Sequence, residues 1–375
     1  MHIIHVVPQY LPSTGGMETY VSSLNRQLTR LGHRSDVATL DYIFKTNEPL
    51  PHYQRLDSTN VIRLPSSGNP RYFFAPRLME MAPRYDVIHV HGVDFFVDLL
   101  GACKGAHGRP LVLSTHGGFF HTPWMPALKS AFFQTVTRFS LRGVDRVIAS
   151  SPTDEQLFSR ISSRVTLVEN GIDYENFALV RNQPAADSLL FIGRISKNKR
   201  VDLLLETLSL LRRQRPLVTL KVVGSDWEGL RAGLEQQADE LGIADAVEFT
   251  GVVPPDRLLA ELTSARLFVS ASDYEAFGLF TVEAMAAGLV PVVSRIPAFM
   301  DLVEDGETGF LTDYRDPAAA AASIRQALEL SDARLVEMRD AARRAASRYD
   351  WSRVVNQIVD IYEEVIAQSR AYCHR

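Results

Sequence analysis

The stretch SLLFIGRISKNKRVDLLLETLSLLRRQ, residues 188–214, decides the fold class. It begins with an apolar run of the kind that forms a strand covered on both faces. A glycine and a basic loop follow, and from Val201 the leucines recur with the 3.6-residue period of an amphipathic helix. The stretch therefore predicts one strand–loop–helix unit of a parallel α/β sheet.

The same pattern recurs along all 375 residues. It predicts strands over 2–7, 35–40, 86–91, 110–116, 146–151, 164–170, 188–194, 219–224, 246–251, 266–272, 290–294 and 309–313. Helical patterns lie between these runs, so we expect an α/β protein with two doubly wound, Rossmann-like domains facing across a cleft.

We expect the N-terminal domain to span 1–180 and the C-terminal domain to span 186–350, with the boundary in the polar, proline-containing segment 181–187. The remaining segment, 351–375, contains an amphipathic helix from Trp351, which we expect to cross back to the first domain.

Composition excludes several classes of protein. The net charge of −4 argues against a nucleic-acid-binding protein. Cys103 and Cys373 form neither a disulfide framework nor a metal cluster, which favours the reducing cytoplasm. No apolar run reaches the length of a membrane span, and the N-terminal residues MHIIHVVPQY are typical of a first strand rather than a signal peptide.

In the first half, polar or glycine residues follow two predicted strands. Gly15 and Gly16 precede a helix, where paired glycines allow close approach of a phosphate, or simply form a strand-to-helix turn. His116 ends a strand and can donate a hydrogen bond to a sugar or phosphate, or merely cap that strand. His121 is a weaker candidate, and His89 and His91 alternate with apolar residues, which favours a structural role for both.

In the second half, charged residues follow two more strands. Arg194 and Lys199 flank a helix start, where two cations can neutralise a diphosphate or form a solvated cluster. Glu275 and Glu283 lie beside a second helix start. Carboxylates there can accept hydrogen bonds from the vicinal hydroxyls of two sugars, or simply complement the helix dipole.

Taken together, these motifs resemble the retaining family 4 glycosyltransferases of the GT-B fold over essentially the whole chain. The motifs that carry the resemblance are Gly15-Gly16, His116, Gly193-Arg194 with Lys199, NGID at 170–173, and Glu275 with Glu283. The resemblance implies an enzyme that transfers a hexose from a nucleotide-sugar with retention of anomeric configuration.

The resemblance also implies a role for each candidate residue of the second half. Arg194 and Lys199 clamp the diphosphate, and Glu283 binds the ribose. Glu275 contacts the transferred sugar, with Phe277 and Gly278 of the same turn as further substrate-binding candidates.

Other implied roles fall on loops at the ends of strands. The Gly15-Gly16 loop closes on phosphate and acceptor, His116 touches the donor sugar, and the backbone of Gly251-Val252 faces the base. Catalytic roles are thereby expected for His116, Glu275, Arg194 and Lys199.

Three positions depart from the family pattern. Arg200 and Ala276 stand where glycine is usual, and Asp301 stands where glutamate is common. These departures leave the fold expectation intact but weaken any inference about the identity of the sugar.

Closer resemblance, in residues 5–21, 87–100 and 113–122, is to the α-mannosyltransferases of bacterial exopolysaccharide assembly. It implies GDP-mannose as donor and a polyprenyl-diphosphate-linked cellobiose as acceptor, with an α-1,3 linkage. UDP-glucose or UDP-N-acetylglucosamine remains an alternative donor, and an epimerase-like enzyme or a non-catalytic glycan-binding module remains an alternative function.

The sequence has no D-x-D pair, and the two cations can stabilise the leaving group, so we expect no metal and no other cofactor. Without a nucleophilic carboxylate in the first half, front-face displacement is favoured over double displacement. The basic, aromatic segment 121–143 indicates a helix that contacts the cytosolic face of the inner membrane, or equally one that packs on the first sheet.

Overall fold

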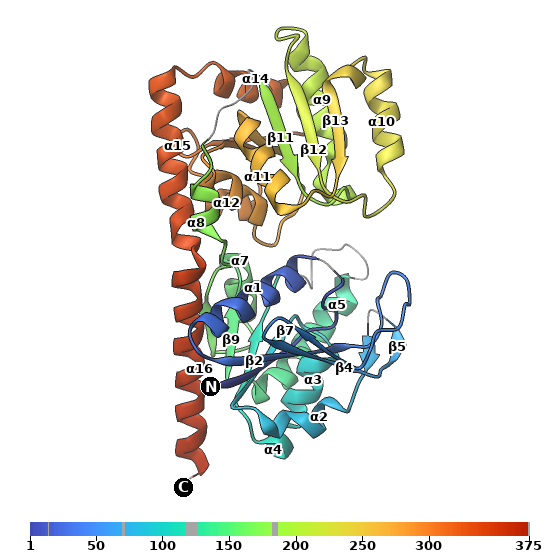
Figure 1. Cartoon of the computed structure of the whole chain (residues 1–375), viewed down its shortest axis with the longest axis vertical. Coiled ribbons are helices and arrows are strands. Elements are labelled where there is room, and N and C mark those ends of the chain that lie inside the picture. Colours follow the sequence, from blue (N-terminus) through green and yellow to red (C-terminus); the bar gives the residue numbers. More distant parts are fainter. Residues whose placement is uncertain (14, 70–71, 118–125, 182–186, 374–375) are drawn as a thin grey trace. The chain divides into compact units, whose positions relative to one another are not determined.

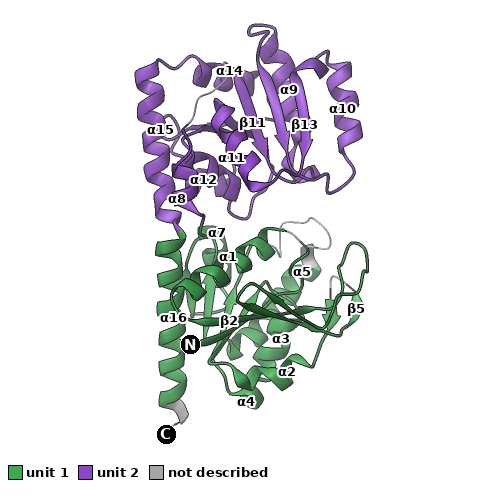
Figure 2. Cartoon of the chain, in the orientation of Figure 1, with its two compact units in different colours: residues 1–171, 351–375 green, residues 172–350 purple. Residues whose placement is uncertain are grey.

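The computed structural model describes residues 1–375 except 14, 70–71, 118–125, 182–186 and 374–375. These residues form two compact units (Figure 2). Unit 1 contains Met1–Gly171 and Trp351–Arg375, and unit 2 contains Ile172–Asp350. The division falls within the NGID motif, before the 181–187 segment that the sequence analysis chose, and the C-terminal helix belongs to unit 1.

Unit 1 is built on an eight-stranded sheet with the order β10-β9-β8-β7-β1-β2-β4-β3. All neighbouring strands run parallel except β3 and β4, which form an antiparallel hairpin at one edge. The strands are β1 (His2–Val6), β2 (Arg34–Leu40), β3 (Tyr53–Leu56), β4 (Thr59–Leu64), β7 (Val87–His91), β8 (Leu111–Ser114), β9 (Arg146–Ala149) and β10 (Val165–Leu167). A separate two-stranded sheet pairs β5 (Ser67–Asn69) with β6 (Tyr72–Phe74).

Helices cover both faces of this sheet (Figure 1). Ile3 and Val7 of the first strand pack toward α1 (Gly16–Arg30) and α16 (Trp351–Cys373), whereas Ile4 and Val6 pack toward the opposite layer. That layer contains α2 (Leu78–Met81), η1 (Ala82–Arg84), α3 (Phe95–Ala102), α4 (Lys104–His107), α5 (Pro126–Phe132), a π-helical turn η2 (Phe133–Thr137), α6 (Arg138–Ser140), η3 (Leu141–Gly143) and α7 (Pro152–Phe158).

Unit 2 contains a wholly parallel six-stranded sheet with the order β13-β12-β11-β14-β15-β16. Its strands are β11 (Ser188–Ile192), β12 (Thr219–Val223), β13 (Val247–Gly251), β14 (Leu267–Ser270), β15 (Val290–Ser294) and β16 (Phe310–Thr312). The central strands β11, β14 and β15 are buried on both faces because helices cover both sides, whereas the edge strand β13 is partly exposed.

One helical layer of unit 2 packs on Leu189 and Phe191, and the other packs on Leu190 and Ile192. The helices are α8 (Tyr174–Ala178), η4 (Lys197–Lys199), α9 (Val201–Arg212), α10 (Arg231–Glu240), η5 (Ala244–Ala246), α11 (Pro255–Ser264), α12 (Leu279–Ala286), α13 (Pro297–Leu302), α14 (Pro317–Leu328), α15 (Asp332–Ala346) and η6 (Ser347–Tyr349). Within the described residues, no helix combines the length and apolar character required to cross a membrane.

The strand order creates one topological switch point in each sheet. In unit 1 the chain proceeds outward from β1 in one direction and later resumes at β7 on the other side; in unit 2 the same reversal lies between β11 and β14. Ligands of doubly wound sheets bind beyond the carboxyl ends of the strands at such points. We therefore expect a ligand-binding site at the loops after β1, β7, β11 and β14.

Every strand predicted from sequence is present, with ends that differ by a few residues. Sequence analysis missed the β3–β4 and β5–β6 hairpins. β5 and β6 have only three residues each, β3 alternates between exposed and partly exposed residues, and β4 interrupts its apolar residues with Asn60 and Arg63, so none has the apolar run of the predicted strands.

Candidate active site

A buried ion pair lies at the switch point of unit 2. Lys199 ends the short η4 helix after β11, and Glu275 lies in the loop after β14. Lys199 Nζ is 2.5 Å from Glu275 Oε1, and the two side chains are only 14% and 16% exposed. Because β11 and β14 are neighbouring parallel strands, their carboxyl-end loops meet at the same edge of the sheet.

Further hydrogen bonds tie these two loops together. The backbone N–H of Asp273 donates to the carbonyl of Asn198 at 2.8 Å, and the Asn198 side-chain amide donates to the carbonyl of Tyr274 at 3.2 Å. The hydroxyl of Ser272 donates to Glu275 Oε1 at 2.9 Å. The Glu275 carboxylate is therefore held by donors from both loops.

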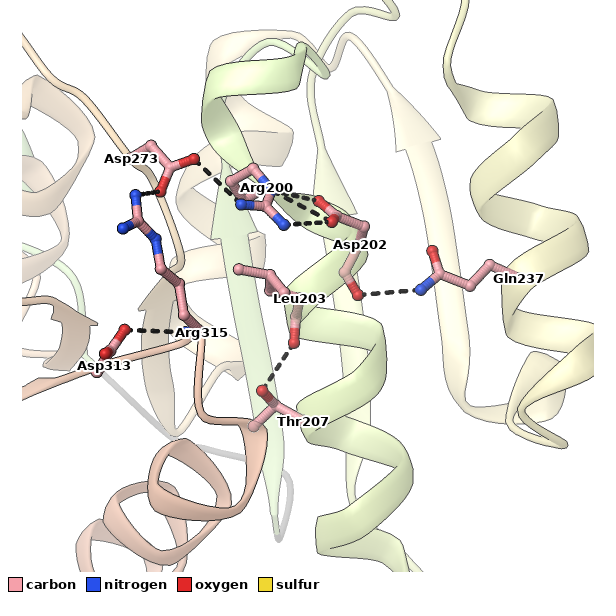
Figure 3. Close-up of polar contacts among 8 residues, drawn as sticks. All are labelled: Arg200, Asp202, Leu203, Thr207, Gln237, Asp273, Asp313 and Arg315. Carbon is pink, nitrogen blue, oxygen red and sulfur yellow. Dashed lines mark hydrogen bonds and ion pairs between the residues drawn. The ribbon is translucent and has the colours of Figure 1, made fainter.

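Arg200, at a position where the family usually has glycine, has left-handed backbone angles of φ 49° and ψ 46°. Its guanidinium pairs with Asp202 at 2.8 Å and with Asp273 at 3.1 Å, and Arg315 donates to the other oxygen of Asp273 at 2.9 Å (Figure 3). The side chain of Arg200 thus joins the loop after β11 to the loop after β14. The sequence shows that residue 200 is not the usual glycine, but it does not predict the ion pairs of Arg200 with Asp202 and Asp273.

Arg194 lies at the same sheet edge but has a different partner. Its guanidinium carbon is 5.1 Å from the centre of the Trp227 ring, and both residues are exposed. Beside it, a Cβ added to Gly224 would lie 1.9 Å from the carbonyl oxygen of Gly193. Glycine is therefore required at 224 for the ends of β11 and β12 to approach so closely.

Glu283 lies in the second turn of α12 and is partly exposed. Loss of hydration, followed by repulsion from the carboxylate of Asp173, raises the pKa of Glu283 to about 8. Asp173 belongs to the NGID motif, so the structure brings that motif into electrostatic contact with the second glutamate. A strongly raised carboxyl pKa is a common property of functional sites.

The turn before α12 corrects one prediction. The Phe277 ring is 5% exposed and packs edge-on against Tyr349 in the core, so its side chain does not face a ligand. Gly278 has a φ of 97° and is the N-cap of α12, a conformation that favours glycine. At the end of β13, Gly251 has a φ of 72° and the Val252 side chain is 74% exposed.

The switch point of unit 1 is lined with histidines. His5 of β1 and His89 and His91 of β7 are buried on the face covered by α1 and α16, and His116 follows β8 with a left-handed φ of 51°. Burial lowers the pKa of His116 to about 4 and that of His5 to about 3, so both are neutral at pH 7. His121 lies outside the described residues.

Asp154 supports the turn that contains His116. Its carboxylate accepts hydrogen bonds from the hydroxyls of Thr115 and Ser150 and from the backbone N–H of Gly117. Burial raises the pKa of Asp154. Sequence analysis missed this residue because only the fold brings the start of α7 beside the end of β8.

Gly15 is the N-cap of α1 and Gly16 its first residue, as the sequence predicts. A Cβ added to Gly15 would lie 2.5 Å from Oε2 of Glu18, whereas Gly16 has open space around it. The carboxylate of Glu18 therefore folds back over the helix start.

The predicted helix over 121–143 is described from Pro126 and is broken by the π-helical turn. Phe133 and Leu141 face the core, whereas Leu128, Val136 and Phe139 are 54%, 39% and 58% exposed. The segment thus has two apolar faces, one of them packed and the other solvent-exposed.

Two parallel-sheet Rossmann-like units, with the Lys199–Glu275 ion pair at the switch point of the second, are typical of the GT-B class of glycosyltransferases. The family model "Glycosyltransferase Family 4" matches residues 14–176, and "Glycosyl transferases group 1" matches residues 180–348. The chain belongs to this glycosyltransferase family.

The curated relatives match over nearly their whole length. The GDP-mannose:cellobiosyl-diphosphopolyprenol alpha-mannosyltransferase of Xanthomonas campestris is 36% identical, over 99% of this chain and 98% of the relative. The protein of the same name from Komagataeibacter xylinus is 34% identical, over 98% and 94%.

Solved structures show the same fold at lower identity. Sucrose-phosphate synthase from Thermosynechococcus elongatus has a TM-score of 0.74 at 22% identity, covering 98% of this chain and 100% of that one. Anabaena HepE in complex with UDP has a TM-score of 0.75 at 21% identity, covering 97% and 100%.

Proposed function

We propose that this protein is a retaining α-mannosyltransferase that moves mannose from GDP-mannose to a polyprenyl-diphosphate-linked cellobiosyl acceptor, with an α-1,3 linkage, in exopolysaccharide assembly. Full-length similarity to relatives of that name supports the choice of donor and acceptor. The observation that carries the chemistry is the pairing of Lys199 with Glu275 at the switch point of unit 2.

In this proposal the second unit binds the donor. Arg194 and Lys199 neutralise the diphosphate, and the Glu283 carboxylate accepts hydrogen bonds from the ribose hydroxyls. Glu275 binds the transferred sugar, and the backbone at Gly251 and Val252 faces the base. The close contact between Lys199 and Glu275 supports neighbouring subsites for the diphosphate and the sugar attached to it.

The first unit supplies the Gly15-Gly16 loop, which we assign to the phosphate and the acceptor, and His116, which we assign to a hydroxyl of the transferred sugar. Neutral His116 can donate from one ring nitrogen and accept at the other. Its position at the carboxyl end of β8, the strand next to β7, supports this assignment.

The reaction breaks the bond between C1 of mannose and the diphosphate oxygen and forms a bond between C1 and the acceptor hydroxyl oxygen on the same face. The hydroxyl proton passes to the departing diphosphate oxygen, so no carboxylate nucleophile is needed. Arg194 and Lys199 stabilise the negative charge that develops on the leaving group. We propose that these two side chains take the place of a metal ion, so activity should survive excess chelator.

The lipid-linked acceptor implies contact with the cytosolic face of the inner membrane. The exposed apolar residues Leu128, Val136 and Phe139, with Arg138 and Arg142 beside them, suit the surface of an anionic membrane. We therefore propose a cytoplasmic protein that associates peripherally with that membrane.

The test is a donor panel followed by a transfer assay. GDP-mannose should raise the melting temperature more than UDP-glucose or UDP-N-acetylglucosamine. With a synthetic polyprenyl-diphosphate cellobiose, it should yield a product one mannose longer. A larger rise in melting temperature with UDP-glucose or UDP-N-acetylglucosamine would show that GDP-mannose is not the donor. Consumption of the nucleotide-sugar without acceptor, or binding without turnover, would favour the epimerase-like enzyme or the glycan-binding module.

A further inference from the structure

Three imidazoles of unit 1, the buried His5 and His91 and the partly exposed His116, form a hydrogen-bonded chain at three neighbouring strands. His5 Nδ1 lies 2.9 Å from His91 Nε2, and His91 Nδ1 lies 3.0 Å from His116 Nε2. His5 lies in β1, His91 lies in β7 and His116 follows β8, and these three strands are consecutive in the sheet. The chain therefore runs from the core to the turn that ends at the carboxyl edge.

The hydrogen bonds among His5, His91 and His116 determine which nitrogen of His116 carries the proton. A neutral imidazole has one N–H donor and one bare acceptor nitrogen. His91 uses both nitrogens within the chain, so it donates to one neighbour and accepts from the other. If His91 carries its proton on Nδ1, then His5 and His116 carry theirs on Nδ1 too; if it carries the proton on Nε2, all three do.

The inner end of the chain is closed. His5 Nε2 is buried and has no hydrogen-bond partner among the described residues, and His5 and His91 have no exposed surface. Water therefore cannot take the place of the hydrogen bond between His5 and His91 without opening the core. His91 also contacts His116 through stacked rings with centres 5.2 Å apart.

We propose that His91 is a positioning residue for glycosyl transfer, which fixes the ring orientation of His116 and, together with His5, the nitrogen that bears its proton. In this arrangement His116 presents Nδ1 to a substrate, and its tautomer is the one shared by His5 and His91. The inference rests on the proposed contact between His116 and the transferred sugar, but the tautomer chain itself can be tested without turnover.

His89 offers a matched control on the same strand. It is as buried as His91, but its nitrogens contact Tyr362 Oη at 2.6 Å and Ser114 Oγ at 2.8 Å rather than His116. His89→Gln keeps an amide near the hydroxyl of Ser114. This variant should show how much activity is lost when a buried histidine of β7 is replaced while the hydrogen bonds among His5, His91 and His116 stay intact.

Two substitutions of His91 separate its two bonds. The amide of His91→Asn stands where Nδ1 was and can still reach His116, whereas the amide of His91→Gln stands where Nε2 was and can reach only His5. We expect His91→Gln to lower kcat about tenfold with donor KM and nucleoside-diphosphate affinity within about twofold, the loss expected when one transition-state hydrogen bond is misdirected. His91→Asn should retain most of the activity, and His89→Gln should behave as wild type.

Nitrogen NMR of histidine-labelled protein reads the tautomers directly. In the wild type we expect His5, His91 and His116 to carry their protons on the same ring nitrogen. In His91→Gln, His116 should show a mixture of tautomers, and in His89→Gln it should not. This measurement needs no donor, so a failure of the proposed function leaves its result intact.

Three outcomes would overturn the proposal. The first is different tautomers on the three rings of the wild-type protein. The second is an equal loss of kcat in His91→Asn, His91→Gln and His89→Gln, which would indicate a general packing role. The third is stoichiometric metal in the purified protein, released by His5→Phe, because a metal held by His5, His89 and His91, whose ligand nitrogens lie within 4.8 Å of one another, would occupy the nitrogens that form the chain.

Discussion

Lys199 and Glu275 are 76 residues apart in the chain, yet Lys199 Nζ lies 2.5 Å from Glu275 Oε1. Each is proposed to serve a different part of the donor, the diphosphate for the lysine and the sugar for the glutamate. Because each residue is proposed to bind a different part of the donor, substitutions of the two should have different effects.

Lys199→Ala should weaken nucleoside-diphosphate binding by about 1.5–3 kcal/mol, the usual contribution of a charged hydrogen bond. Glu275→Gln removes the carboxylate that holds Lys199, so it should leave that affinity unchanged or slightly improved while it depresses turnover with donor and acceptor. Calorimetry and initial rates measure both. Lys197→Ala, in the same loop but exposed, is the control. Equal loss of nucleotide affinity in Glu275→Gln and Glu283→Gln would refute the division of roles.

Glu283 should make nucleotide binding pH-dependent. Its pKa in the free protein is raised to about 8, so at pH 7 the carboxyl is mostly protonated. If the bound form is the carboxylate, binding releases a proton, and affinity for the nucleoside diphosphate should rise by up to about tenfold per pH unit from pH 6 toward 8. Calorimetry in buffers of different ionisation enthalpy counts that proton. Glu283→Gln should bind more weakly and without this dependence; an unchanged slope would assign the proton to another group.

Two substitutions of Arg200 distinguish the effect of backbone strain on stability from the effect of ion pairing. Arg200→Ala and Arg200→Gly both remove the bridge to Asp202 and Asp273, but only glycine relaxes in the left-handed conformation. Urea unfolding should therefore find the glycine variant more stable than the alanine variant by about 1 kcal/mol. Arg315→Ala, which loses only the partly exposed pair to Asp273, should change stability by less than about 1 kcal/mol. Equal stability of the alanine and glycine variants would show that residue 200 does not keep this conformation.

His5 should destabilise the protein in mild acid. Its pKa is about 3 when folded and near 6.5 when unfolded, so below pH 6.5 only the unfolded chain takes up the proton. The wild type therefore loses this contribution to stability as pH falls from 6.5 toward 3, and keeps it in full above 6.5. The free energy of unfolding of His5→Phe relative to wild type should rise by about 2 kcal/mol between pH 7 and 5. A difference that does not vary with pH would show that His5 is hydrated in the folded protein.

The exposed apolar face of 126–143 should bind anionic vesicles. Phe139→Ser and Val136→Ser should reduce co-sedimentation with anionic vesicles at low salt, and raising the salt should weaken wild-type binding by screening Arg138 and Arg142. Leu217→Ser, which alters a residue 81% exposed in unit 2, is the control for general hydrophobicity. Equal binding to neutral and anionic vesicles would contradict the electrostatic part of this proposal.

The sequence by itself determined the buried parallel strands and the residues at their ends, but not the β3–β4 and β5–β6 hairpins. Apolar runs such as 188–192 are covered on both faces wherever they occur, so their local pattern is sufficient to predict them. The positions of Gly15, Gly16, His116, Arg194, Lys199 and Glu275 after strands or at helix starts follow from the same pattern. Even Phe277 was correctly placed in a turn, although its ring proved to be part of the core.

Only the tertiary structure decided which strand ends meet. The order of strands depends on packing between segments far apart in sequence, and no local pattern encodes that β11 lies beside β14 or that β1 lies beside β7. These two adjacencies bring Lys199 to Glu275 and His5 to His91. Burial is likewise a property of the assembled layers, and it raises the pKa of Glu283 and lowers the pKa values of His5, His91 and His116. The residues of the site could therefore be named from sequence, but their partners and protonation states could not, because both depend on neighbours that only folding supplies.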